Sequence, residues 1–196
     1  MDSARAVTRA VADFVAGHLP GVEHVCVGLS GGPDSLALTA AALRAGLTVR
    51  ALIVDHGLQD GSAEVAEGAA HAATELGATA QILPVSVGRD GGLEAAARTA
   101  RYDALREAGD GDPVLFGHTM DDQAETVLLG LGRGSGGRSI AGMRPWSPPW
   151  GRPLLGVRRA QTRAMCAELG LMPHHDPHNS DPVSYTHLRA HETEAD

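Results

Sequence analysis

Short apolar runs alternate with longer alanine-rich stretches along most of this chain. The apolar runs are rich in valine, isoleucine and leucine and have the length of buried strands, whereas the alanine-rich stretches have helical spacing. Strands are predicted at His24 to Gly28, Thr48 to Asp55, Thr79 to Val87, Val114 to Gly117 and near Pro153 to Leu155. Helices are predicted at Ala4 to Gly17, Asp34 to Ala45, Ser62 to Leu76, Leu93 to Ala108, Asp121 to Leu129 and Arg158 to Leu169. This alternation predicts an α/β fold: a Rossmann-like, five-stranded parallel sheet with helices on both faces.

The pattern weakens in two places. Residues 130 to 142 hold six glycines, too many for a regular element, and predict a loop. From Ser184 onward the chain loses its bias towards glycine, proline and alanine, and it resembles translated adapter sequence. We therefore expect one domain over residues 1–183, and a non-native or disordered tail over residues 184–196.

Composition narrows the possible functions. With 43% hydrophobic and 20% charged residues, the 196-residue chain is globular, and without a signal peptide or a long apolar run it is expected to be cytoplasmic, with no membrane partner. Cys26 and Cys166 form no CxxC motif, which argues against zinc ribbons, thioredoxin chemistry and cysteine-ligated clusters. Lysine is absent, so a Walker A loop is excluded. The net charge of −8 provides no general attraction for nucleic acid.

A glycine-rich loop between the first strand and its helix has the context of an anion site. The loop consists of Ser30, Gly31, Gly32, Pro33, Asp34 and Ser35. Glycines allow the backbone to approach a phosphate, helix amides point towards it, and the two serines add hydroxyl donors. A carboxylate at Asp34 would repel a phosphate unless a metal ion lay between them, which indicates Mg²⁺ bound with a nucleotide.

Two other interpretations of this loop remain open. Gly28 to Gly32 fits the G-x-S-x-G nucleophile elbow, with Ser30 as the nucleophile of a serine hydrolase and His118 or His174 as its base. The oxyanion segment of such hydrolases is missing from the chain. The loop is also consistent with a simple glycine turn capped by serine.

Charged residues follow the other strands. Asp122 and Glu125 are three positions apart on one helix face, where they can chelate Mg²⁺, hold an ammonium ion, or merely favour a helix N-terminus. His118 can contact a phosphate or cap its turn. Arg98 and Arg101 are also three apart and can face one cleft, or form a solvated helix face.

Taken together, these motifs resemble the tRNA(Ile)-lysidine synthetase family of PP-loop ATP-pyrophosphatases, over roughly residues 22 to 183. The resemblance depends on SGGPDS after the first strand, VDHGL after the second, EAAAR and RY on the fourth helix, and GHTMDDQAET after the fourth strand. It implies an adenine nucleotide alpha hydrolase-like fold that binds ATP and Mg²⁺ through the loop, Asp55 and His56. It also implies activity-critical roles for Arg98, His118 and Asp122, with Asp34 and Asp122 at the metal and Glu125 in the catalytic site.

The implied reaction is a two-step ligation in tRNA processing. The wobble cytidine of an isoleucine tRNA with a CAU anticodon is adenylated at its C2 oxygen, with release of pyrophosphate. Free L-lysine then attacks C2 and expels AMP, forming lysidine. Acidic residues would bind the incoming amine, and the glycine loop with Mg²⁺ would hold the pyrophosphate.

The chain departs from the family pattern in two ways. Gln59 stands where the family usually has arginine, and the arginine-rich and helical C-terminal parts that help grip tRNA are missing, so little or no lysidine formation is expected without them. An inactive ATP-binding fragment is therefore an alternative to the ligase. A related tRNA thiolase is disfavoured, because Cys26 and Cys166 cannot supply a CxxC arrangement.

Overall fold

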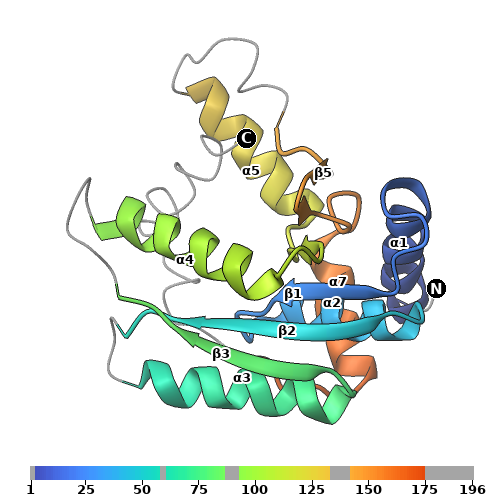
Figure 1. The fold of residues 1–196 in the computed structure, drawn as a ribbon. Helices are drawn as coiled ribbons and strands as arrows, with labels where there is room; N and C mark the ends of the chain where they lie inside the picture. Colours follow the sequence, from blue (N-terminus) through green and yellow to red (C-terminus); the bar gives the residue numbers. More distant parts are fainter. Residues whose placement is uncertain (1–2, 58–60, 87–92, 133–141, 175–196) are drawn as a thin grey trace.

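The computed structural model describes residues 3–57, 61–86, 93–132 and 142–174 (Figure 1). Its helices are α1 (Ser3–His18), α2 (Pro33–Arg44), α3 (Ser62–Leu76), α4 (Leu93–Gly109), α5 (Met120–Gly132) and α7 (Arg159–Glu168). Its strands are β1 (His24–Gly28), β2 (Thr48–Asp55), β3 (Thr79–Pro84), β4 (Val114–Leu115), β5 (Trp146–Ser147) and β6 (Trp150–Gly151). The 184–196 tail and most of the predicted 130 to 142 loop lie outside the described residues.

The strands form one sheet in the order β3-β2-β1-β4-β6-β5. All neighbours from β3 to β6 pair in parallel, and only β5 runs antiparallel, beside β6 at the edge. The sequence order reverses direction between β1 and β4, which is the type of position where open α/β sheets bind ligands. The α/β class and the five parallel strands are confirmed, with one antiparallel strand added.

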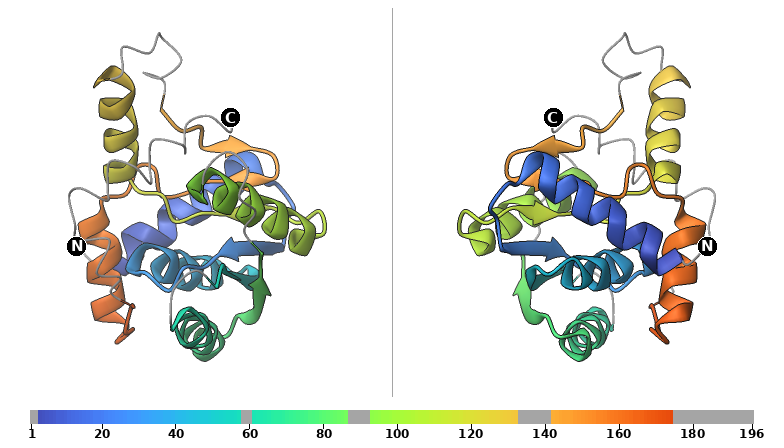
Figure 2. Two further views of the ribbon diagram at one scale, coloured as in Figure 1. Left: turned by 90° about the vertical axis from the view of Figure 1, so that its left-hand side faces the viewer. Right: turned by 90° about the vertical axis from the view of Figure 1, so that its right-hand side faces the viewer.

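Side chains alternate between the two faces of the central strands, so the protein has two apolar layers. Val25 and Val27 of β1 pack in the larger layer with α1, α2, α3 and α7. Cys26 points the other way, into a smaller layer with Leu105 of α4 and Phe116. Helices therefore cover both faces, with α4 on one side and α3 on the other (Figures 1 and 2).

The predicted fifth strand was wrong by a few residues. Pro153 to Leu155 form a turn, whereas the fifth parallel strand is β6 at Trp150–Gly151. Pro153 lacks an amide hydrogen, so it cannot donate to a ladder. The amide of Arg152 donates instead to Pro145 O at 2.8 Å, closing the β5–β6 hairpin.

Most other boundaries agree with the sequence pattern. The bounds of β1, β2 and α3 are those predicted, and the remaining helices differ by up to three residues at an end. Strand β3 ends at Pro84, earlier than predicted, and residue 87 lies outside the described part. Among the described residues, no helix is both long and apolar enough to cross a membrane.

Close packing at Gly151 generates a stability prediction. A Cβ at this position would lie 2.6 Å from Leu115 Cδ2 and 2.9 Å from Phe14 Cζ, so Gly151→Ala must displace buried side chains. We expect it to lower the free energy of unfolding by about 1–3 kcal/mol, measured by urea denaturation. Gly68→Ala, in α3 with nothing within 4 Å, is the matched control and should raise it by about 0.5–1 kcal/mol. Equal effects of the two substitutions would contradict this packing.

Candidate functional site

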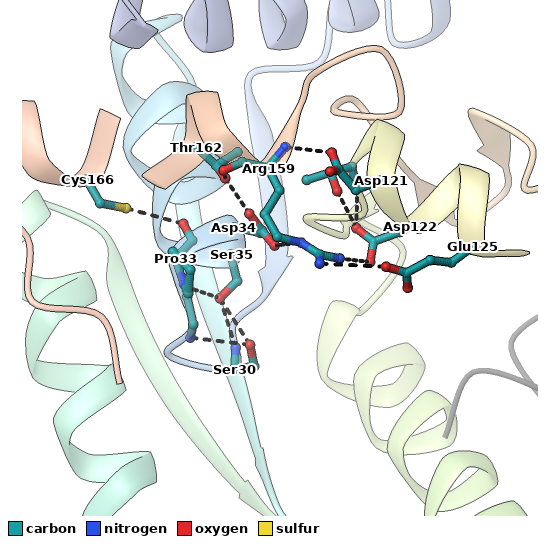
Figure 3. Close-up of polar contacts among 12 residues, drawn as sticks. Ser30, Pro33, Asp34, Ser35, Asp121, Asp122, Glu125, Arg159, Thr162 and Cys166 are labelled. Atoms are coloured by element: carbon teal, nitrogen blue, oxygen red, sulfur yellow. Dashed lines mark hydrogen bonds and ion pairs between the residues drawn. The ribbon is translucent and has the colours of Figure 1, made fainter. Parts of the chain in front are cut away.

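The loop after β1 is held in shape by its own serines. Ser30 Oγ and Ser35 Oγ lie 3.2 Å apart, and Ser35 Oγ donates to Gly32 O at 3.1 Å. Gly31 has a φ of +79°, in the left-handed region that glycine adopts without steric cost. The loop therefore turns sharply between β1 and α2, with both hydroxyl groups on its inner side (Figure 3).

The beginning of α2 is open towards an external acceptor. Gly32 is its N-cap residue and provides no side-chain hydrogen bond. Gly117, after β4, lies against the same helix end, where an added Cβ would be 2.9 Å from the Asp34 backbone carbonyl. This combination of an uncapped helix N-terminus and close backbone approach is what an anion-binding loop requires.

A buried thiol contacts the loop from α7. Cys166 Sγ donates to Pro33 O at 3.3 Å (Figure 3). Burial raises the pKa of the Cys166 thiol to about 11. The group therefore remains a protonated donor at neutral pH.

The acidic residues at the start of α5 are held by hydrogen bonds. Asp122 is buried, with 4% of its surface exposed. Its Oδ2 atom accepts from both Thr119 N and Thr119 Oγ1, each at 2.6 Å. Asp122 thus caps its own helix while presenting Oδ1 to its surroundings.

Arg159, at the first position of α7, lies at the centre of the carboxylates (Figure 3). Its Nε atom is 3.6 Å from Asp34 Oδ2, and its Nη2 atom is 2.9 Å from Asp122 Oδ1. Its Nη1 atom is 3.7 Å from Glu125 Oε1. One guanidinium therefore joins the loop after β1 to the acidic face of α5.

Backbone and hydroxyl contacts bring three helix N-termini to this point. The Arg159 amide donates to Asp121 Oδ2 at 2.8 Å, and Thr162 Oγ1 of α7 donates to Asp34 Oδ1. Helices α2, α5 and α7 therefore begin side by side, and α5 and α7 then diverge (Figure 2). Their N-terminal dipoles add positive potential around the carboxylates.

Two effects oppose each other at Asp34. Burial raises the pKa of this carboxyl, and the nearby charge of Asp122 raises it further. The Thr162 hydrogen bond and the charges of Arg159 and Arg163 lower the pKa, but the net effect is a raised value. Asp34 is therefore a carboxylate whose ionised form is costly in the folded state.

Basic and aromatic residues gather on the α4 side of the sheet. The Arg98 guanidinium carbon is 4.7 Å from the Tyr102 ring centroid, and that of Arg101 is 5.8 Å from the Phe116 ring centroid. The Phe116 and His118 rings are 5.7 Å apart. The site therefore has an acidic group from α2 and α5, gathered around Arg159 of α7, and a basic group on α4.

The end of β2 adds two polar residues. Asp55 Oδ1 accepts from Gly57 N at 3.0 Å, and this hydrogen bond lowers the pKa of Asp55. Burial and the charge of Arg101 lower the pKa of His56. Its buried Nδ1 atom has no hydrogen-bond partner among the described residues. His56 is thus a neutral imidazole with an unused polar atom at neutral pH.

The geometry favours an anion-binding loop over a serine nucleophile. Within the described ranges, Ser30 Oγ bonds with Ser35 Oγ and Gly32 N, and no histidine contacts it. The hydrogen bond from His174 to this loop comes from its backbone, whose amide donates to Gly31 O at 2.9 Å. The described residues therefore contain no base for the predicted hydrolase.

A cavity of about 460 Å³ also opens beside the loop. It lies between α2 and α3, where Leu36, Val65 and Ala69 line it, and Gly31 forms one wall. The carboxylates around Arg159 do not line it. The convergence of charges, and not this mainly apolar hollow, therefore defines the candidate site.

The structure brings some predicted site residues together and adds others. Asp34, Asp122 and Glu125 meet around one guanidinium, as expected for a single site. Arg159 and Thr162 were missed by the sequence interpretation. A signal was present, because two arginines at a helix start oppose the macrodipole and indicate carboxylates from elsewhere.

Comparisons with known proteins show which proteins this chain is similar to. The chain is 64% identical to a tRNA(Ile)-lysidine synthase from Nocardia farcinica over 182 residues, covering 92% of this chain and 57% of that protein. It is 65% identical to the enzyme of the same name from Rhodococcus opacus, covering 90% of this chain and 54% of that protein. The chain thus spans about half the length of the curated relatives it matches.

A likeness to solved structures concerns the fold. The U34-tRNA thiolase NcsA from Methanococcus maripaludis superimposes with a TM-score of 0.71 at 18% sequence identity, covering 95% of this chain and 70% of that one. A family model described as a PP-loop domain matches residues 3–190. Together with the glycine-rich loop between β1 and α2, this match over nearly the whole sequence shows that the chain belongs to the PP-loop domain family.

Proposed function

We propose that this chain is the catalytic domain of an ATP-dependent ligase that converts the wobble cytidine of an isoleucine tRNA to lysidine in the cytoplasm. The observation that carries the proposal is that Asp34 of the glycine-rich loop meets Asp122 and Glu125 of α5 around one guanidinium. The names of the relatives support the same reaction.

The loop after β1 fits the phosphates of ATP. A cradle is formed by the uncapped start of α2, the paired hydroxyls of Ser30 and Ser35, and the backbone of residues 31–33. The unpartnered Nδ1 of His56, near Asp55 at the end of β2, offers a further contact for the nucleotide. Binding in this cradle would hold the pyrophosphate leaving group at a helix N-terminus.

The carboxylates of the site would bind Mg²⁺ only if the phosphates of a bound nucleotide supplied further ligands. Asp34 and Asp122 offer carboxylate oxygens, the ligand type that Mg²⁺ prefers. Among the described residues, no cluster of three or more His, Cys, Asp or Glu side chains is arranged to hold a metal ion alone. Mg²⁺ commonly takes one or two carboxylates and completes its shell with phosphate oxygens and water, and there it would neutralise phosphate charge.

The acidic group suits the second substrate, free L-lysine. Asp122 and Glu125 share the α5 face that points to Arg159, and the single guanidinium leaves the group with net negative charge. An ammonium ion of the amino acid would be attracted there. In this position the acidic group would bind and orient the amine for attack on C2 of the cytidine.

The basic group on α4 suits the nucleic acid side of the reaction. His118 follows β4, and Arg98 lies beside Tyr102 on α4; such groups would stabilise the charge that develops on phosphate oxygens during adenylation. The cytidine of a CAU anticodon would enter between these residues and the loop. C–O cleavage at C2 then releases AMP as the lysine nitrogen bonds to the same carbon.

The ligase activity is tested by lysine transfer. ATP-dependent incorporation of labelled lysine into isoleucine tRNA is measured for this chain joined to the C-terminal part of the Nocardia farcinica relative. We expect incorporation that falls by at least about a hundredfold in Asp122→Asn, because a buried charged contact is lost. The chain alone, assayed in parallel, tests the alternative of an ATP-binding fragment. Absence of incorporation by the fusion would overturn the proposal.

Backbone approach at Gly117 gives a prediction for nucleotide binding. In Gly117→Ala, the Cβ would collide with backbone atoms of Asp34 and Ser35, at 2.9 to 3.0 Å, and displace the start of α2. We expect ATP affinity, measured by calorimetry with Mg²⁺, to fall by about tenfold or more, since small displacements of a positioned group are costly. Gly156→Ala, with nothing within 4 Å, should bind as the parent chain does. Unchanged affinity in Gly117→Ala would argue against a phosphate at this loop.

The charge of Asp34 is expected to lower the stability of the folded protein and to strengthen ATP binding. Because burial raises its pKa, the contribution of this group to stability is complete at acidic pH and is lost as pH rises through the folded-state pKa. Asp34→Asn should therefore raise the urea midpoint at pH 7, with a smaller difference at pH 3. With saturating Mg²⁺, its ATP affinity should fall by about tenfold, the scale of one charged contact. Asp13→Asn, on the exposed face of α1, is the control for both measurements. A lower midpoint at pH 7 would contradict this assignment.

A further inference from the structure

Arg159 supplies positive charge among three carboxylates that lie close to the loop proposed to bind phosphates. Asp34 belongs to the loop proposed to hold phosphates, and Asp122 and Glu125 approach it from α5. A polyphosphate beside three carboxylates is repelled, and the repulsion is strong where solvent is partly excluded. Only 24% of the Asp34 side chain and 5% of the Asp122 side chain are exposed.

The position of Arg159 is fixed by more than its charge. Its own amide is held by Asp121, and its carbonyl accepts from Thr162 Oγ1 at 2.8 Å. The Arg159 side chain is 18% exposed, and its guanidinium contacts the three carboxylates through three different nitrogen atoms. A planar fork with fixed donors holds such a set in one geometry, which a flexible ammonium does less well.

We propose that Arg159 is a positioning residue that serves as the built-in counter-ion of Asp34, Asp122 and Glu125, allowing ATP to bind beside them before Mg²⁺ completes the charge balance. This inference depends on the proposed binding of ATP at the loop. It assigns to Arg159 no contact with the reacting atoms.

This role predicts a specific link between Arg159 and Mg²⁺. Without the guanidinium, the carboxylates retain one more net negative charge and repel the phosphates. Divalent cations bound with the nucleotide can replace the missing charge, so the defect should shrink as Mg²⁺ rises. A purely structural role for Arg159 would weaken binding equally at every Mg²⁺ concentration.

The experiment measures ATP affinity of the chain by calorimetry at trace Mg²⁺ and at 10 mM Mg²⁺, at constant ionic strength. Arg159→Gln should bind about tenfold more weakly than the parent at trace Mg²⁺ and within about threefold at high Mg²⁺. Arg159→Lys, which keeps the charge, should recover most of the loss. Arg9→Gln removes a charge from the exposed face of α1, away from the carboxylates, and should follow the parent.

A charge-compensated variant keeps the test decisive if Arg159→Gln does not fold. Arg159→Gln combined with Glu125→Gln restores the net charge of the cluster and should regain parental ATP affinity at trace Mg²⁺. A loss in Arg159→Gln that is independent of Mg²⁺, or no loss at all, overturns the role of Arg159. Failure of the parent chain to bind ATP under either condition would instead overturn the proposed nucleotide site.

Discussion

Asp34, Asp122 and Glu125 come from α2 and α5, yet all three approach the guanidinium of Arg159 on α7. The three helices begin at one point, where their amide ends carry partial positive charge and would repel one another without acidic partners. Asp121 accepts from the first amide of α7, and Thr162 binds Asp34. The arrangement of the site thus depends on electrostatic attraction. The carboxylates attract three helix N-termini and one guanidinium to the same place.

The parallel sheet determines where these charged residues lie. Parallel pairing of β1 with β2 and β4 brings the residues after each strand to the same edge. Small residues make the approach close enough, because Gly117 lies against the backbone of Asp34. The acidic group of α2 and α5 and the loop after β1 consequently lie together at this edge of the sheet.

Local signals predicted much of this architecture from the sequence. Strands β1 and β2 are short apolar runs bounded by turn residues, and α3 ends at Gly77 with the left-handed glycine that its sequence indicates. The fifth parallel strand was misplaced because its pairing is set by the β5–β6 hairpin, not by an apolar run. Arg159 was missed because its partner Asp122 is 37 residues away, and Thr162 meets Asp34 across 128 residues. Contacts of that range depend on how helices pack, which periodicity alone does not encode.

The Cys166 thiol that donates to Pro33 O is expected to react slowly with oxidants and alkylating reagents. Oxidants and alkylating reagents react with the thiolate, and burial with a pKa of about 11 keeps that form scarce at neutral pH. Cys26, the other cysteine, is also buried, and burial raises its thiol pKa as well. The loop after β1 is therefore contacted by a thiol that stays protonated at neutral pH, the form that reacts slowly with these reagents.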